Sequence, residues 1–139
     1  MKELEILAKR ENLSEVLKLI DAELESRECT IRLQTQIDVA VEEIFVNISS
    51  YAYDPGEGYT TIRVEVTEDP TTIVITFIDE GTPYDPLAKP DPNMKIPIKE
   101  RKKGGLGIYM VKKSMDDVSY EYKDGKNMLT IKKLLGEKG

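Results

Sequence analysis

The sequence predicts an α+β fold, a two-layer sandwich in which one layer of helices covers a mostly antiparallel β-sheet. Three observations favour this class. Two long segments repeat apolar residues at helical spacing, several short segments are rich in β-forming residues, and the last two of these flank an Asp-Gly turn. The chain of 139 residues is expected to form a single domain, 1–139, with a core that buries roughly two thirds of the unfolded surface.

The first half of the chain is predicted to carry one strand and two long helices. Residues 2–7 (KELEIL) alternate weakly and indicate a strand. Asn12 and Glu15 resemble a capping box, which predicts a helix from this point to about Ser26. Residues 31–53 predict a second, longer helix, which the following DPGEG turn would end.

The second half is predicted to contribute most of the sheet. Residues 60–66 alternate and indicate a strand, whereas 71–79 consist almost entirely of β-formers and are placed in the centre of the sheet. Residues 105–115 have a helical pattern. Residues 118–123 and 127–133 would form a hairpin around the intervening Asp-Gly pair.

One segment fits no regular element. Most of the seven prolines lie between Thr82 and Lys103, without helical or strand periodicity. A structureless stretch of about 20 residues within a small domain is usually either a functional lid or a disordered segment. The flanking DEGTP and KKGGLG motifs favour a lid at about 82–103.

Composition excludes several kinds of chemistry. The chain has no histidine and one cysteine, which excludes Ser-His-Asp and Cys-His catalysis and metal sites built on these residues. The net charge of −6 argues against a general nucleic-acid or anionic-membrane surface. No run of about 18 apolar residues is present, and the start, MKELEILAKR, lacks the pattern of a secretory signal. We therefore expect a cytoplasmic protein.

Two polar side chains stand out beside the apolar face of the second helix. At about 100° per residue, Glu43 and Asn47 lie along the edge of this face, whereas Asp38, Glu42 and Ser49 are expected to point to solvent. One interpretation is a pair that exchanges a hydrogen bond on the helix surface. The other is a cleft, in which Asn47 offers an oxygen to a hard cation such as Mg²⁺ and Glu43 accepts a proton from a hydroxyl or a water. The apolar face itself is formed by Ile37, Ala40, Val41, Ile44 and Ile48.

The most apolar strand ends in Asp79-Glu80-Gly81-Thr82-Pro83. A carboxylate on the last strand residue could accept a hydrogen bond from an exocyclic amino group, such as that of adenine. The glycine that follows lets the backbone turn away and a flat ligand come close. An ordinary turn after a strand is the alternative interpretation.

Small residues open the third predicted helix, at Gly104-Gly105-Leu106-Gly107. They expose backbone N–H groups, and the helix macrodipole adds a favourable potential for phosphate. The preceding Arg101, Lys102 and Lys103 could contact the same phosphates, or could form an ordinary solvated charge run.

The order and spacing of these motifs resemble the Bergerat ATP-binding fold. E-x-x-x-N on a helix, D-x-G at a strand end, a proline-rich lid and G-x-G at a helix start follow one another in the superfamily of gyrase, histidine kinases and MutL (GHKL). Within it the chain most resembles the anti-sigma-factor serine kinases of bacteria, over nearly its whole length. The resemblance implies a mixed, mostly antiparallel sheet beneath a helical layer.

The resemblance also implies a role for each motif residue. Glu43 would act as general base, Asn47 would coordinate Mg²⁺ between the phosphates of ATP, and Asp79 would bind the adenine amino group. Gly81 would shape the pocket, and Lys103 would contact the terminal phosphate. The complete cofactor-binding set is Asn47, Asp79, Gly81, Lys103, Gly104, Gly105, Leu106, Gly107 and Asn127, with Asn47 as the metal ligand.

Three positions depart from the family pattern. Tyr51-Ala52 occupies the place of a common His-Gly, and Pro83 stands where a second glycine of the strand-end motif would often lie. Asn127 occupies the place of a threonine that helps to hold the adenine-bound aspartate.

The implied function is an ATP- and Mg²⁺-dependent serine/threonine protein kinase that also acts as an anti-sigma-type regulatory factor. Its phosphoacceptor would be a serine on a small STAS-type antagonist, its second partner a sigma factor, and its assembly a homodimer. Two alternatives stay open. One is a nucleotide-dependent protein-binding regulator without phosphoryl transfer, and the other is a scaffolding domain that has lost nucleotide binding.

Overall fold

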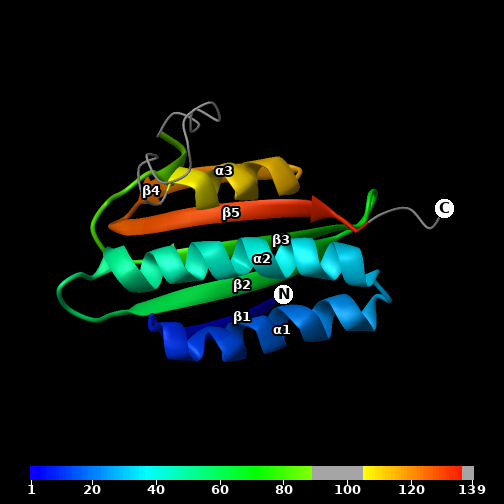
Figure 1. Cartoon of the computed structure of the whole chain (residues 1–139), viewed down its shortest axis with the longest axis horizontal. Coiled ribbons are helices and arrows are strands. Elements are labelled where there is room, and N and C mark those ends of the chain that lie inside the picture. The colour runs from blue at the N-terminus through cyan, green and yellow to red at the C-terminus, as the bar shows by residue number, and fades with distance from the viewer. Residues whose placement is uncertain (89–104, 136–139) are drawn as a thin grey trace.

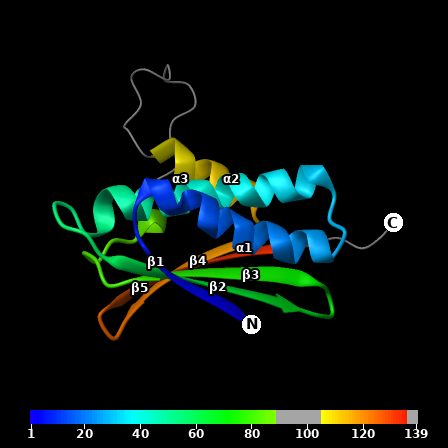
Figure 2. The ribbon, with the colours of Figure 1, turned by 90° about the horizontal axis from the view of Figure 1, so that it is seen from below.

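The computed structural model describes residues 1–88 and 105–135. In these residues one five-stranded sheet has the order β1-β2-β3-β5-β4, and the α-helices lie together on one of its faces (Figures 1 and 2). This arrangement is a two-layer sandwich and confirms the predicted α+β fold class. The elements are β1 (Lys2–Leu7), α1 (Leu13–Ser26), α2 (Ile31–Asn47), β2 (Tyr59–Thr67), β3 (Thr72–Asp79), α3 (Gly105–Ser114), β4 (Asp117–Lys123) and β5 (Lys126–Leu134).

Strand β3 is the middle strand, as its apolar sequence predicts. Its Ile75 pairs with Val64 of β2 on one side and with Ile131 of β5 on the other. Every strand pairing among the described residues is antiparallel, so this part of the chain contains no parallel pair of the kind a mixed sheet would have. Among the described residues, every helix is too short or too polar to span a membrane.

The hydrophobic core lies between the sheet and the helices. Helix α2 contributes the face predicted from its periodicity, because Ile37, Ala40, Val41 and Ile44 are all buried. Since this face holds α2 on the sheet, the direction of the polar side chains at its edge is also set. The remaining buried members of the core are Val16, Ile20, Leu24, Phe45, Ile62, Val64, Ile73, Ile75, Phe77, Val111, Met115, Leu129 and Ile131.

The predicted capping box at the start of α1 is wrong. The side chain of Asn12 accepts no hydrogen bond from a helix N–H group, and its Nδ2 donates instead to the carbonyl oxygen of Leu7 at 2.9 Å. Asn12 therefore fastens the start of α1 to the end of β1. A side-chain cap does occur on α2, where Thr30 Oγ1 accepts from the N–H of Leu33 at 3.1 Å.

Helix α2 also ends differently from the prediction. The α-helical part stops at Asn47 and continues as a π-helical turn, Ile48–Ala52. The wider turn changes the direction of the side chains that follow it, and such turns are frequent at functional sites. Here it places Tyr51 and Ala52 beside the end of β3.

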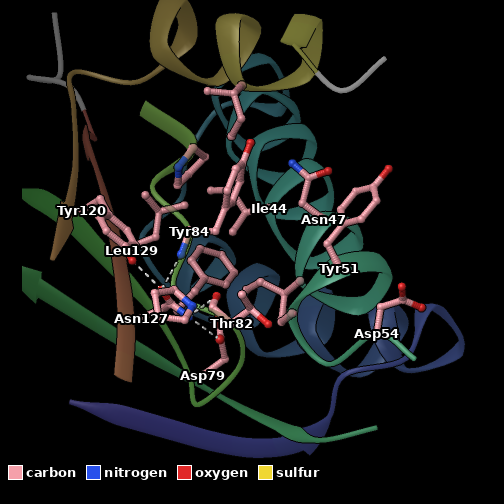
Figure 3. A pocket seen from close by; sticks show the side chains of 16 residues that line it. Ile44, Asn47, Tyr51, Asp54, Asp79, Thr82, Tyr84, Tyr120, Asn127 and Leu129 are labelled. Atoms are coloured by element: carbon pink, nitrogen blue, oxygen red, sulfur yellow. Dashed lines mark hydrogen bonds between the residues drawn. The ribbon is translucent and has the colours of Figure 1, made fainter. Parts of the chain in front are cut away.

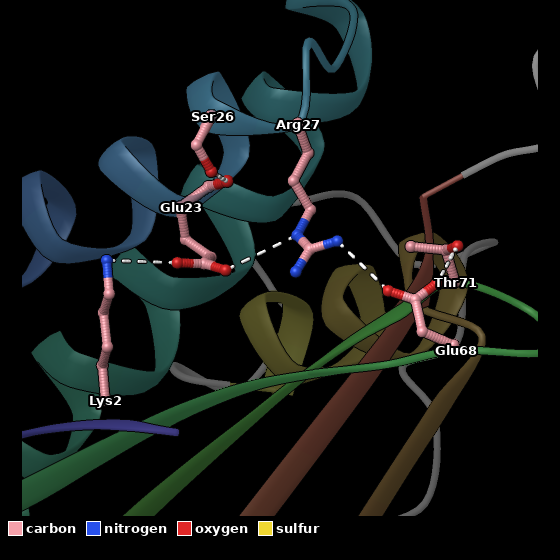
Figure 4. A network of polar contacts seen from close by, with 6 residues as sticks. All are labelled: Lys2, Glu23, Ser26, Arg27, Glu68 and Thr71. Atoms are coloured by element: carbon pink, nitrogen blue, oxygen red, sulfur yellow. Dashed lines mark hydrogen bonds and ion pairs between the residues drawn. The ribbon is translucent and has the colours of Figure 1, made fainter.

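A chain of polar contacts fastens the end of α1 to the sheet (Figure 4). Glu23 lies 3.2 Å from Lys2 of β1 and 3.5 Å from Arg27. Arg27 also lies 3.3 Å from Glu68 in the β2–β3 turn, and Glu68 accepts from Thr71 at 2.8 Å. Each exposed pair stabilises the fold only slightly, because solvent screens it. The network lies at the end of β3 opposite to Asp79.

The prediction that Asp38 points to solvent is wrong. Asp38 faces Asp21 of α1, and one oxygen of each carboxyl is buried without a hydrogen-bond donor among residues 1–88 and 105–135. Burial, followed by the contact with Asp21 and the charge of Glu25, raises the pKa of Asp38 to about 7. The helical periodicity of α2 alone could not show that α1 covers this side of the helix.

We expect Asp38→Asn to stabilise the protein above pH 7. The folded-state pKa of about 7 lies above the ordinary value near 4, so the folded state binds the extra proton and stability falls as the pH rises between these values. The substitution removes this loss. The gain should be about 1 kcal/mol, less than the pKa shift alone implies because solvent screens a partly exposed carboxyl.

Urea unfolding at pH 4 and pH 8 measures the effect, with Glu42→Gln, an exposed position on the same helix, as control. The stabilisation should be present at pH 8 and nearly absent at pH 4. An equal effect at both pH values would contradict the assigned cause.

Candidate functional site

A cavity of about 490 Å³ opens between α2, α3 and the ends of β3 and β5 (Figure 3). Its volume and its mixture of apolar walls with a few directed polar groups are typical of small-molecule sites. The apolar lining includes Ile44, Ile48, Phe77, Ile108 and Leu129. The polar lining includes Asn47, Tyr51, Asp54, Asp79, Thr82, Tyr84, Tyr120 and Asn127.

The structure brings together several of the residues singled out in the sequence. Asn47, Asp79 and Asn127 line the same cavity, although they come from α2, β3 and β5. Glu43 lies one helical turn before Asn47, just outside the cavity lining. A Cβ atom built on Gly107 would lie only 2.2 Å from Glu43 Oε2, so this carboxylate sits against the first turn of α3.

The remaining predicted site residues are described only in part. Helix α3 begins at Gly105, as predicted, and the backbone of Leu106 is helical. Lys103 and Gly104 lie outside the described residues. So does most of the predicted lid, of which the structure describes 82–88 with a short 3-10 helix, Pro86–Ala88.

Asp79 is the last residue of β3, and only 6% of its surface is exposed. Its Oδ1 accepts two hydrogen bonds of 2.9 Å, from the N–H of Gly81 and from Nδ2 of Asn127. These bonds offset the cost of burying a carboxylate. All hydrogen bonds assigned to Asp79 within residues 1–88 and 105–135 go to Oδ1, which leaves Oδ2 as an acceptor for a molecule in the cavity.

Gly81 is required by a close contact between backbones. A Cβ atom at this position would lie 2.2 Å from the carbonyl oxygen of Ala52, and the N–H of Thr82 donates to the same oxygen at 2.9 Å. The end of the π-helical turn and the segment after β3 are therefore in direct contact. The sequence motif predicts a functional glycine at this position, but it does not predict the contact with the backbone of Ala52.

We expect Gly81→Ala to lower the free energy of unfolding by about 2 to 3 kcal/mol, the cost of forcing extra volume into a packed site. The new methyl group would overlap a backbone carbonyl, which cannot rotate away as a side chain can. Gly56→Ala serves as control, because its Cβ would lie 3.3 Å from the nearest neighbour. A similar loss of stability in both variants on urea unfolding would show that the Ala52 contact is not the cause.

Tyr53 joins the start of β2 to the residue that follows β3, and no sequence motif predicts this role. Its hydroxyl donates to the carbonyl oxygen of Tyr59 at 2.6 Å and accepts from the N–H of Glu80 at 2.7 Å. Burial raises the pKa of this hydroxyl, which keeps it protonated and able to donate. Tyr84 and Tyr120 also line the cavity, and no motif predicts this, because they come from the segment after β3 and from β4, which only the fold brings together.

Comparison with known proteins defines the class of protein that has this fold and this site. A model of the histidine kinase-like ATPase domain matches residues 6–133. The chain therefore belongs to the histidine kinase-like ATPase family, and the GHKL resemblance is confirmed.

Three individual relatives show which kinds of protein in this family the chain resembles. The serine/threonine-protein kinase BtrW of Bordetella bronchiseptica is 27% identical, over 72% of this chain and 70% of the relative. An anti-sigma F factor of Caldanaerobacter subterraneus is 29% identical, over 93% of this chain and 89% of the relative. The serine-protein kinase RsbW of Halalkalibacterium halodurans is 32% identical, over 64% of this chain and 56% of the relative. These relatives are protein serine kinases or an anti-sigma factor.

Proposed function

We propose that this chain is an ATP- and Mg²⁺-dependent serine/threonine protein kinase that phosphorylates a STAS-type antagonist and also binds a sigma factor. In this proposal residues 1–139 form one nucleotide-binding domain with a lid at about 82–103, and the protein acts in the cytoplasm as a homodimer. The observation that carries the proposal is the meeting of Asn47 and Asp79 in one cavity, with Glu43 against the start of α3.

The cavity suits an adenine ring. Oδ2 of Asp79, which has no partner in the part of the chain that the structure describes, is an acceptor for the exocyclic amino group, whereas guanine would present a carbonyl oxygen at that place. Phe77, Ile44 and Leu129 line the cavity with apolar surface that a planar ring can cover. Gly81 acts indirectly in this proposal, because it brings the end of the π-helical turn against the segment that follows Asp79.

The start of α3 suits the phosphates. Gly105, Leu106 and Gly107 begin a helix of 10 residues, whose first N–H groups have no partner within the helix and whose macrodipole favours negative charge. Glycine at 107 also leaves the room that the carboxylate of Glu43 occupies. We assign Gly104 and Lys103, which precede this turn, to further phosphate contacts.

The protein groups at the site can hold Mg²⁺ only when a nucleotide supplies further oxygen ligands. The described residues contain no group of three or more Asp, Glu, Cys or His side chains that could hold a metal ion. Mg²⁺ commonly takes few protein ligands and completes its shell with phosphate oxygens and waters, so Asn47 alone is a sufficient protein ligand. The ion would neutralise phosphate charge during transfer.

In the proposed reaction Glu43 accepts the proton of the attacking serine hydroxyl. The serine oxygen forms a bond to the γ-phosphorus, the bond from that phosphorus to the β–γ bridging oxygen breaks, and ADP leaves with the electron pair. The protein contributes mainly position and charge, which explains how a chain without histidine can perform this step.

The proposal is tested by calorimetry with Mg²⁺-ATP and Mg²⁺-ADP, followed by incubation with STAS proteins and γ-labelled ATP. Labelled serine on a STAS protein supports the kinase. Nucleotide binding without label on any tested partner favours the regulator without phosphoryl transfer. No nucleotide binding contradicts the proposal and leaves the scaffolding domain.

A further inference from the structure

Asn127, the second residue of β5, is hydrogen-bonded on every side at the floor of the cavity (Figure 3). Its Nδ2 lies 2.9 Å from Oδ1 of Asp79, 3.1 Å from the carbonyl oxygen of Thr82 and 3.3 Å from that of Gly81. The amide nitrogen thus joins β5 to the end of β3 and to the segment that follows it.

The oxygen of the same amide has two donors. Oδ1 accepts from the N–H of Tyr84 at 3.2 Å and from the hydroxyl of Tyr120, on the neighbouring strand β4. Burial raises the pKa of Tyr120, so its hydroxyl stays protonated and able to donate at neutral pH.

Backbone groups fix the orientation of this amide. The N–H of Tyr84 can only donate, so Oδ1 must face it, and the carbonyl oxygens of Gly81 and Thr82 can only accept, so Nδ2 must face them. The two hydrogens on Nδ2 face three acceptors, and both lone pairs of Oδ1 face donors. Asn127 therefore has no hydrogen-bonding group left for a ligand.

We propose that Tyr120, acting through Asn127, is a positioning residue for recognition of the nucleobase. The two side chains hold Oδ1 of Asp79 within the protein and fix the plane of its carboxylate, so that Oδ2 is presented to the exocyclic amino group of adenine. Asn127 acts on the nucleotide through Asp79, and Tyr120 acts through Asn127. This inference rests on the proposed function, since it presumes an adenine nucleotide in the cavity.

The network also reaches the first residues of the segment that leaves β3. Thr82 and Tyr84 bond to the same amide that orients Asp79. A threonine, which occupies this place in the family pattern, has one donor and a shorter side chain and could not bind both backbone groups and the aspartate at once. The asparagine thus couples the shape of this segment to the orientation of the base-binding carboxylate.

The test is Tyr120→Phe, with the dissociation constants of ADP and GDP measured by calorimetry. Removing one hydroxyl donor should weaken ADP binding about 3- to 10-fold and leave weak GDP binding unchanged, so the preference for ADP falls by the same factor. Tyr122→Phe is the matched control, because Tyr122 lies on the same strand and is 47% exposed. An ADP affinity like that of the control, or equal weakening of ADP and GDP, would overturn the positioning role.

A second variant, Asn127→Asp, changes charge but hardly changes shape. The new carboxyl would face the carboxylate of Asp79, so ADP binding should be weak at pH 8 and recover towards pH 5.5, where a shared proton restores the donor. The ADP affinity of the unsubstituted protein should show no such recovery. If the ADP affinity of Asn127→Asp is equally independent of pH, the inference is contradicted.

Amide hydrogen exchange at Tyr84 in the nucleotide-free protein gives a readout that does not depend on binding. Exchange should be faster in Tyr120→Phe than in Tyr122→Phe, and equal rates would count against the network. If the unsubstituted protein binds no ADP, the proposed function fails. If it binds ADP and Tyr120→Phe behaves like the control, only the positioning role fails.

Discussion

Replacing Glu43 with glutamine is expected to reduce phosphoryl transfer to a partner serine about 100- to 10,000-fold, the range that general-base catalysis contributes. Glutamine keeps the size of the side chain but cannot accept the proton. ADP binding should change less than about twofold, because Glu43 lies outside the cavity lining and contacts the start of α3. Single-turnover transfer from γ-labelled ATP and calorimetry with ADP measure the two effects separately.

The adjacent Glu42→Gln is the matched control, since Glu42 is exposed on the outer side of the same helix. It should leave both transfer and ADP binding unchanged. Unchanged transfer in Glu43→Gln would remove Glu43 from its proposed role, whereas a joint loss of transfer and ADP affinity would make it a binding residue.

Replacing Asp79 with asparagine is expected to weaken ADP binding about 10- to 100-fold, the loss that follows from removing a hydrogen bond to a charged group. The amide oxygen of the new side chain can still accept from Gly81 and Asn127 in place of Oδ1. Its NH₂ group then faces the cavity, so a hydrogen-bond donor stands where Oδ2 of Asp79 was an acceptor. Calorimetry should show that the preference for ADP over GDP shrinks together with the affinity for ADP.

Glu80→Gln is the control for this prediction, because Glu80 is the next residue and is exposed. It should bind ADP normally. Unfolding by urea must show that Asp79→Asn is folded at the temperature of the binding measurement. A folded variant with normal ADP affinity would place the adenine elsewhere.

The fold follows from patterns that are local in the sequence. The run of β-formers at 71–79 predicts β3 (Thr72–Asp79) almost to the residue. The Asp-Gly pair predicts the β4–β5 turn, and Asp124 and Gly125 indeed have φ angles of 54° and 77°, which a two-residue hairpin of this type requires. These features could be predicted because each depends on a few consecutive side chains.

The features that were missed depend on contacts between elements. Asp38 was placed in solvent because the periodicity of α2 does not show where α1 lies, and Asn12 bonds to the end of β1 rather than to its own helix. The hydrogen bonds of Asn127 could not be foreseen either, since they require the register of β3, β4 and β5. No propensity or motif contains this information.

The candidate site could be predicted from the sequence only in part. Asn47 and Asp79, which separate motifs single out, line one cavity, because an α+β fold of this order brings the edge of α2 to the end of the central strand. The roles of these residues and of Glu43 stay predictions. The same holds for Lys103, Gly104 and the lid, most of which lies outside the described residues.

The π-helical turn Ile48–Ala52 divides the long helical segment into two sections that should differ in their tolerance of substitution. The section before it is anchored by buried residues, and a substitution at any of these disturbs the packing of the whole domain. Tyr51, by contrast, is 62% exposed at the rim of the cavity and has no share in the hydrophobic core. The entrance of the cavity can therefore be changed through this turn, while the helix that carries Glu43 and Asn47 keeps its place.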